Sequence, residues 1–204
     1  MKKLFLIIFL ITAAMVSYAD DQIIDLDGKS IILHDDFTWS YVNKGKAKLS
    51  KEIVLNFDPL NTTVLTSKNE KFAININLIQ WVQTTGINES ADFQFVNADE
   101  TGYGVLIFDG LPVPLESLKD ILIMNANSID PNARIIDVTS CTVNNSNGEL
   151  VTYVASYSGL EFIFYTYITT NDNGTIQFTF YTLSTKFEEL KPSFQEAISG
   201  LEFY

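Results

Sequence analysis

Four long apolar segments, separated by short polar turns, constrain the fold of this chain more than any other feature of its sequence. The segments span residues 134–143, 150–157, 160–169 and 175–183. The separators at 144–148, 158–159 and 171–174 consist mainly of Asn, Ser and Gly. Turns this short between segments of strand length join neighbouring antiparallel strands. The second half of the chain is therefore predicted to form an antiparallel β-meander.

Further strands are predicted earlier in the chain, over residues 62–66, 72–77, 92–96 and 104–108. In the second of these, Phe72, Ile74 and Ile76 alternate with Ala and Asn, which indicates a strand with one buried face. Residues 160–168 are apolar or aromatic on both alternations. That strand is therefore predicted to be central, with layers against both faces of its sheet.

Two segments show helical patterns instead. Apolar residues recur at helical spacing through residues 115–127. Near the C-terminal end, Thr185 and Glu188 have the spacing of a capping box, and an apolar helix face continues to Leu201. The expected fold class is therefore α+β, a largely antiparallel β-sheet with two helices packed on it.

Residues 1–19 have the organisation of a secretory signal peptide. A positive n-region at Lys2 and Lys3 precedes an uncharged apolar run that is too short for a transmembrane helix. Ser17 and Ala19 then place small residues at the positions that a signal peptidase reads. The mature protein is therefore expected to be exported to the periplasm or the extracellular space, without a transmembrane anchor.

The remainder of the chain is expected to have three parts. Residues 20–43 predict a small β-meander, because the dipeptide Asp27-Gly28 marks a hairpin turn. Residues 44–51 carry four lysines and few apolar side chains, as a solvated linker does. Residues 52–204 are predicted to form the α+β domain.

The first of these parts resembles a short β-module found near the start of bacterial envelope proteins. The residues that carry the resemblance are Asp27-Gly28, Asp35-Asp36 and Thr38-Trp39. The resemblance implies a location in the bacterial envelope more than a function. An exported chain with a single cysteine, Cys141, is likewise typical of bacteria, since it contains no internal disulfide.

Residues 52–204 resemble a PsbP-like domain in the order of their predicted elements. The resemblance is carried by Phe72-Ala73-Ile74-Asn75-Ile76, Trp81, Gly159-Leu160-Glu161-Phe162 and Gly200-Leu201-Glu202-Phe203. It implies an α/β/α sandwich, a fold that hosts photosystem extrinsic subunits, a nuclear-import cofactor and bacterial secretion chaperones. These are mostly non-catalytic binders of protein. A shared fold does not fix a function, so no site residues are transferred from the family.

The chain is strongly acidic, with 25 Asp and Glu residues against 13 Lys and Arg residues and a net charge of −12. Loss of Lys2 and Lys3 with the signal peptide makes the mature chain more acidic still. Such a charge repels nucleic acid and anionic lipid. We therefore expect no nucleic-acid partner, and the partner that suits the charge is an envelope protein with a basic or mixed surface.

Few residues qualify as chemical sites. His34 is the only histidine and Cys141 the only cysteine, and neither comes with the partner residues that zinc binding or nucleophilic catalysis needs. The run Asp25-Leu26-Asp27-Gly28 lacks the further oxygen ligands of a calcium loop and is interpreted as a turn. No catalytic residue, metal or cofactor is therefore expected.

The candidate binding surface is aromatic. The predicted strands over 160–169 and 175–183 carry aromatic side chains on both alternations. Tyr165, Tyr167 and Tyr181 are assigned to the exposed alternation and are predicted to contact a ligand or partner. Tyrosine suits this role because it offers a large contact area at low entropic cost and keeps a polar tip.

The expected function is that of a non-catalytic envelope protein that binds another protein or a small ligand. A hydrolase that uses Glu188 and Glu189 is an alternative class, although adjacent carboxylates on a helix point apart. A structural or surface protein without a specific ligand is a third class. A pocket with converging carboxylates would favour the enzyme, and a wide sheet face without titratable groups would favour binding.

Overall fold

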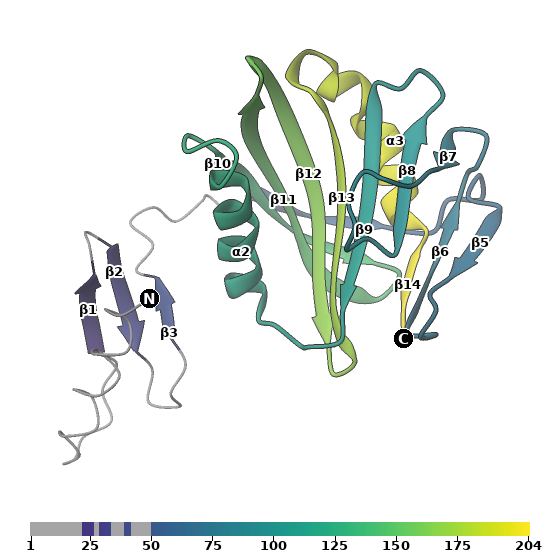
Figure 1. The fold of residues 1–204 in the computed structure, drawn as a ribbon. Coiled ribbons are helices and arrows are strands. Elements are labelled where there is room, and N and C mark those ends of the chain that lie inside the picture. Colours follow the sequence, from purple (N-terminus) through teal and green to yellow (C-terminus); the bar gives the residue numbers. More distant parts are fainter. Residues whose placement is uncertain (1–21, 27–28, 34–38, 42–49) are drawn as a thin grey trace. The chain divides into compact units, whose positions relative to one another are not determined.

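The computed structural model describes residues 22–26, 29–33, 39–41 and 50–204 of the chain (Figure 1). The chain divides into two compact units, residues 1–45 and 46–204. The predicted signal peptide at 1–19 and His34 lie outside the described residues, as does most of the expected linker. The expected linker is wrong at Ser50, which lies in the described part of the chain and belongs to a strand of the second unit.

In the first unit, three short strands pair side by side. They are β1 (Gln22–Leu26), β2 (Lys29–Leu33) and β3 (Trp39–Tyr41). Each neighbouring pair is antiparallel, with Ile23 opposite Ile32 and Ile32 opposite Ser40. This is the strand order of a meander, and its turns, including Asp27-Gly28, lie outside the described residues.

The second unit is built on an eight-stranded sheet with the order β4-β10-β11-β12-β13-β9-β8-β7. In that order the strands are β4 (Ser50–Leu55), β10 (Arg134–Val143), β11 (Ser146–Tyr157), β12 (Leu160–Asn171), β13 (Gly174–Leu183), β9 (Gly102–Asp109), β8 (Phe93–Asn97) and β7 (Trp81–Gln83). All neighbouring strands are antiparallel except β4 and β10, which are parallel. The predicted antiparallel meander is therefore confirmed as β10 to β13.

Strands β11, β12 and β13 are longer than the sequence pattern predicts, because the turns on either side of the β11–β12 pair contain only two residues. Asn144 and Asn145 have φ angles of 44° and 71°, and β11 begins directly after them at Ser146. Ser158 and Gly159, with φ angles of 52° and 80°, join β11 to β12 in the same way. Positive φ at both central residues is the signature of the hairpin turn whose twist matches the flanking strands.

A second, three-stranded sheet has the order β14-β6-β5, with β14 at Leu201–Phe203, β6 at Phe72–Ile76 and β5 at Thr63–Thr66. The prediction that β6 has only one buried face is wrong, since all five of its residues are buried. The polar face is covered as well, and the Asn75 amide donates to Glu202 Oε1 at 3.0 Å. Leu201, expected at the end of a helix, instead pairs with Ile74 as part of β14.

The two predicted helices are present as α2 (Leu115–Asn127) and α3 (Phe187–Ser199). The predicted capping box is wrong, because Thr185 lies in a 3-10 turn at Ser184–Lys186 and the first turn of α3 receives no side-chain cap. An α+β fold with two helices on a largely antiparallel sheet is thus confirmed.

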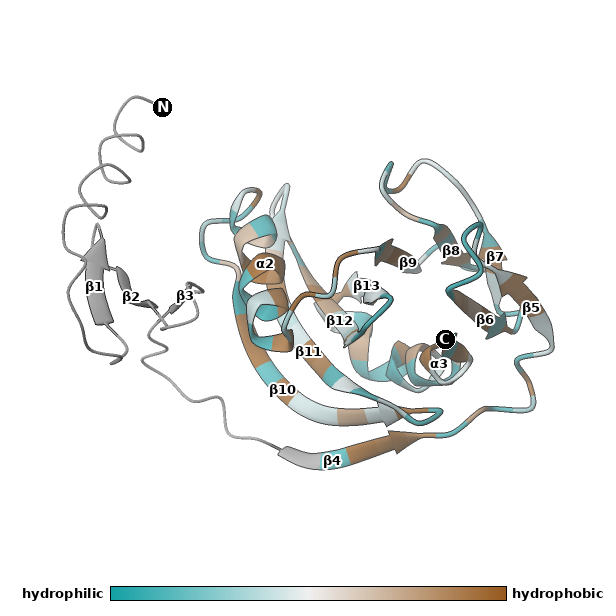
Figure 2. Ribbon diagram, turned by 90° about the horizontal axis from the view of Figure 1, so that it is seen from below, coloured by the Kyte–Doolittle hydropathy of each residue, from teal (hydrophilic) through white to brown (hydrophobic). Residues whose placement is uncertain are grey.

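The helices cover opposite faces of the large sheet, as Figure 2 shows for α3, which lies between the two sheets, and α2, which lies on the other side. The larger core joins α3 to both sheets and contains the buried rings of Trp81, Tyr167 and Phe194. The smaller core joins α2 to β10, β11 and β12 through Leu118, Val151 and other apolar side chains. Strand β12 contributes to both cores, which confirms that it is central.

Candidate binding groove

The candidate binding site is a groove between α2 and the sheet face that this helix only partly covers. Helix α2 packs mainly against β11 and β12, and no other described helix lies over the same face of β13 and β9. The resulting cavity has a volume of about 570 Å³. Its walls are mostly apolar and aromatic and include Val105, Ile107, Leu122, Phe162 and Phe164.

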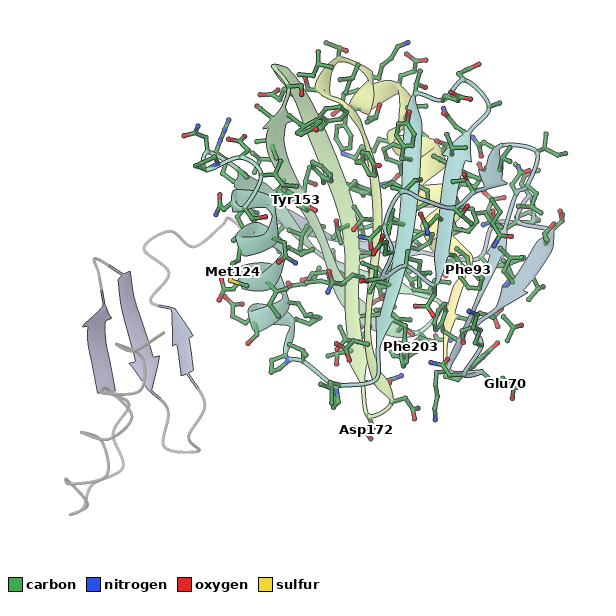
Figure 3. All side chains as sticks on the ribbon, in the orientation of Figure 1. Glu70, Phe93, Met124, Tyr153, Asp172 and Phe203 are labelled. Atoms are coloured by element: carbon green, nitrogen blue, oxygen red, sulfur yellow. The ribbon has the colours of Figure 1, made fainter. Side chains whose placement is uncertain are left out.

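Its floor carries a row of four stacked aromatic rings on four adjacent strands, which we call the aromatic row: Tyr153, Phe164, Tyr181 and Tyr103. Strand register places them opposite one another, from β11 through β12 and β13 to β9. Successive ring centroids are 4.8, 5.2 and 5.2 Å apart, with interplanar angles of 3°, 25° and 19°. Figure 3 shows Tyr153 beside α2, at one end of the row.

The aromatic row follows from the geometry of paired strands. Opposite side chains on one face of an antiparallel sheet lie about 4.5–5.5 Å apart at Cβ, which is the spacing at which rings stack. Because each inner ring has a neighbour on both faces, Phe164 and Tyr181 present their edges rather than their faces to a ligand. Three of the four rings line the cavity, and Tyr103 lies beyond it.

Polar groups enter the groove along β13. Gln177, Thr179 and Tyr181 are two residues apart from one another, so all three point from the same face of the strand. The Thr179 hydroxyl is paired with that of Thr166 at 2.9 Å. Within the described part of the chain, the Gln177 amide and the Tyr181 hydroxyl make no hydrogen bond, so both remain available to a ligand.

The electrostatics of the groove are those of a neutral site. Burial raises the pKa of Tyr153 to about 12 and that of Tyr181 to about 12. Both phenols therefore stay protonated at physiological pH and serve as hydrogen-bond donors. No Asp, Glu, Lys, Arg, His or Cys side chain lines the described walls. The groove can bind and orient a molecule, and it has no acid–base pair with which to transform one.

Of the three tyrosines predicted to form an exposed surface, only Tyr181 lies in the groove. The prediction is wrong for Tyr165 and Tyr167, which are 3% and 0% exposed and belong to the core beneath α3. The Tyr165 hydroxyl accepts from Gln195 Nε2 at 2.9 Å, and the Tyr167 hydroxyl donates to the Ser146 carbonyl at 2.7 Å.

The physical reason is the side-chain alternation of β12. Phe162 and Phe164 point to the groove, so the residues between and after them point to the opposite face and α3. The sequence interpretation assigned Tyr165 and Tyr167 to the exposed alternation of this strand, whereas Phe162 and Phe164 occupy that alternation in the structure. The groove residues can be identified from the strand register, because Phe164 lies opposite both Tyr153 and Tyr181.

The remaining candidate residues lie outside the groove. Cys141 is buried, and burial, together with the charge of Glu52, raises its thiol pKa to about 12. Glu188 and Glu189 are exposed in the first turn of α3, where Glu189 pairs with Lys186 at 2.8 Å. The described residues include no group of three or more His, Cys, Asp or Glu side chains able to hold a metal ion.

A second cavity of about 350 Å³ lies near β4, β10 and α3. Glu52, Asp137 and Lys191 are among the residues that line it, and both carboxylates are exposed. The Lys191 amine lies 5.4 Å from the centroid of the buried Phe187 ring. Because its charges face solvent, this cavity is less suited than the groove to enclosing a ligand.

Neither described helix has the combination of length and apolar character that crossing a lipid bilayer requires. No protein-family model and no curated protein matches the sequence. Solved structures do match. The solution structure of the cyanobacterial PsbP protein CyanoP from Synechocystis sp. PCC 6803 aligns with a TM-score of 0.52 and 13% identity, over 70% of this chain and 92% of that one.

Two further structures are more distant. The Ran-binding protein Mog1p of Saccharomyces cerevisiae aligns with a TM-score of 0.48 and 4% identity, over 69% of this chain and 94% of that one. A Pseudomonas aeruginosa protein of unknown function has a TM-score of 0.43 and 9% identity, over 88% and 94% of the two chains. The chain therefore has a PsbP-like fold, and this likeness concerns the fold alone.

Proposed function

We propose that this chain is a non-catalytic binding protein that holds a small, mainly apolar ligand in the groove between α2 and the sheet. The observation that carries the proposal is the groove itself, an aromatic cavity of about 570 Å³ without an ionisable side chain other than tyrosine. Small-molecule sites in proteins are typically concave and mostly apolar, roughly 300–1,000 Å³ in volume, with a few polar groups that fix orientation.

The rim of the groove supports the same function. Tyr157 and Ile129 line it and are 67% and 66% exposed, so apolar surface surrounds the opening. A ligand that covers such surface removes it from water, which favours binding by about 25 cal/mol for each Å² of apolar area. The alternative of a hydrolase finds less support, because Glu188 and Glu189 are exposed and no carboxylate lines the groove.

The signal-peptide pattern of residues 1–19 supports a role outside the cytoplasm, in the periplasm or the extracellular space. The net charge of −12 suits delivery to, or retention by, an envelope protein with a basic or mixed surface. In this proposal the acidic surface contacts the partner protein and the neutral groove binds the ligand.

A fluorescence titration tests the proposal. N-Phenyl-1-naphthylamine is uncharged and becomes fluorescent in apolar surroundings, so saturable enhancement is expected with the full mature chain. Ile107→Trp fills the half-buried wall of the groove and is expected to weaken the probe at least about tenfold. Val64→Trp makes the matched change on β5, away from the groove, where Val64 is 59% exposed.

Circular dichroism first establishes that both variants keep the fold of the parent. Equal probe affinity in the parent and both variants, or the absence of saturable binding to the parent, would reject the groove as a ligand site. Such a result would leave the structural or surface protein as the better description of the chain.

A further inference from the structure

The groove offers hydrogen-bond donors but no charge, which restricts the class of ligand it suits. The Tyr181 hydroxyl and the Gln177 amide are the two polar groups on β13 without a hydrogen bond to another described residue. They are four residues apart on an extended strand, so their Cα atoms are separated by about 13 Å. A ligand that contacts both lies along the strand and is elongated.

An anionic ligand finds no counter-charge in this groove. No Lys, Arg or His side chain lines its described walls, and the chain as a whole is strongly negative. Removing a carboxylate from water without a cationic partner is costly, whereas a neutral oxygen needs only a donor. A fatty-acid carboxylate is therefore a poor occupant of the enclosed part of the groove.

A cationic ligand is disfavoured for two separate reasons. No Asp or Glu lines the walls to pair with it. Cations also bind the negative faces of aromatic rings, and the faces of Phe164 and Tyr181 are covered by their stacked neighbours in the aromatic row. The exposed ring edges carry partial positive charge, which complements the face of an aromatic ligand or the lone pairs of an oxygen atom.

We infer that the groove selects an elongated, uncharged aromatic or apolar molecule whose hydroxyl or carbonyl oxygen accepts a hydrogen bond from Tyr181. This inference rests on the proposed function, because it names the ligand class of the same groove. Tyr181 acts as the selecting residue, and Tyr153 and Phe164 supply contact area.

Competition against N-phenyl-1-naphthylamine tests the inference with two ligands of one shape. 4-Phenylphenol is neutral at pH 7, whereas biphenyl-4-carboxylate carries a negative charge on the same two-ring frame. We expect 4-phenylphenol to displace the probe at a concentration at least about tenfold lower, because its hydroxyl needs no counter-charge.

Two Tyr→Phe variants locate the selecting hydroxyl. Tyr181→Phe is expected to weaken 4-phenylphenol about three- to tenfold, the loss that one neutral hydrogen bond produces, and to weaken the probe, which has no oxygen, by a smaller factor. Tyr103→Phe is the matched control, since Tyr103 belongs to the aromatic row but its hydroxyl donates to the Glu100 carbonyl at 2.8 Å, outside the cavity. Tyr103→Phe is expected to change neither the affinity for 4-phenylphenol nor that for the probe.

The outcomes distinguish a wrong ligand selectivity from a groove that binds no ligand. If Ile107→Trp blocks the probe but the carboxylate competes as well as the phenol, or Tyr181→Phe matches Tyr103→Phe, the groove is a ligand site and the inferred selectivity is wrong. If the probe does not bind the parent chain, the proposed function itself fails, whatever the two competitors do.

Discussion

Tyr153 on β11 and Phe164 on β12 stack almost parallel, with ring centroids 4.8 Å apart and an interplanar angle of 3°. Tyr153 is buried in the core beneath α2, whereas Phe164 is half-buried and lines the groove. The pair therefore connects the packing of α2 to the shape of the cavity. A change in one ring is expected to affect both stability and binding.

Replacing Phe164 by Leu tests this connection. The change removes ring contacts with Tyr153 and Tyr181, so the free energy of unfolding is expected to fall by about 1–2 kcal/mol. Urea denaturation measures the loss, and the probe titration is expected to show weaker binding. Tyr157→Leu, at an exposed position on the rim, is expected to change stability by less than about 0.5 kcal/mol. Equal stability of the two variants would contradict the connecting role of Phe164.

Alkaline pH is expected to destabilise the protein. Burial raises the pKa of Tyr153, Tyr165 and Tyr181 to about 12 in the folded chain. Because a raised tyrosine pKa favours the neutral form, its contribution to stability is complete below pH 10, the unfolded value, and is lost as the pH rises toward 12. Urea midpoints are expected to be level from pH 8 to 9.5 and to fall above pH 10.

Absorbance at 295 nm follows the same ionisation directly. Ionisation of the buried Tyr153, Tyr165 and Tyr181 is expected to coincide with loss of the folded state. A urea midpoint that stays constant through pH 11 would show that burial does not control these phenols.

The thiol of Cys141 is expected to be unreactive in the folded protein. It is 2% exposed, and its pKa is raised to about 12, so little thiolate forms at neutral pH. Ellman's reagent is expected to react slowly with the native chain and completely after denaturation. Rapid reaction of the native protein would mean that β10 opens or that the thiol has an activating partner.

The ion pair between Lys119 and Glu149 is expected to hold α2 onto β11. The amine lies 2.9 Å from Glu149 Oε2, both side chains are 16% exposed, and Glu116 lies 2.8 Å away on the same helix. Burial lowers the pKa of Lys119, but the hydrogen bonds that its amine donates to Glu116 and Glu149, together with the charges of both, outweigh it and raise the pKa. Lys119→Met is expected to cost about 1–3 kcal/mol, because a half-buried carboxylate loses its cation.

A double-mutant cycle isolates that pair. Lys119→Met combined with Glu149→Gln is expected to be more stable than Lys119→Met alone, since the uncompensated charge is gone. Denaturation by urea at pH 7 supplies all four free energies. Additive losses would show that the two side chains do not interact.

The exported form is expected to begin at Asp20. The pattern that predicts this cleavage is the pair of small residues Ser17 and Ala19 after the apolar run. The intact mass of protein recovered outside the cytoplasm is the measurement. Recovery of an exported chain that still carries Met1 would contradict the predicted cleavage.

The parts of the fold that could be predicted from the sequence are those determined by residues close together in the chain, such as the turns between neighbouring strands. The two-residue turn between Asn171 and Gly174 sets the register of β12 with β13, and that register places Phe164 opposite Tyr181. Strand β4 was not predicted, because it begins inside the lysine-rich stretch 44–51 that was interpreted as a linker and because its partner, β10, is about ninety residues later in the chain. Such non-local pairing leaves no local pattern.

Only part of the candidate site was predicted, because the packing of the helices is also non-local. The sequence of β12 is apolar on both faces, and which face is left partly open depends on where α2 and α3 pack. Tyr181 was identified, whereas Tyr165 and Tyr167 were assigned to the surface and are buried. How much of the eight-stranded sheet the thirteen-residue helix α2 covers cannot be predicted from the periodicity or the composition of the sequence.

The partial cover by α2 makes the two walls of the groove mechanically unequal. Backbone ladders and the aromatic row together join β11, β12, β13 and β9, so spreading two rings also requires separating two strands. Helix α2 is attached to that floor by one small core and by Lys119. We therefore expect a thicker ligand to displace α2 before it separates these strands, with the ion pair between Lys119 and Glu149 opposing that displacement.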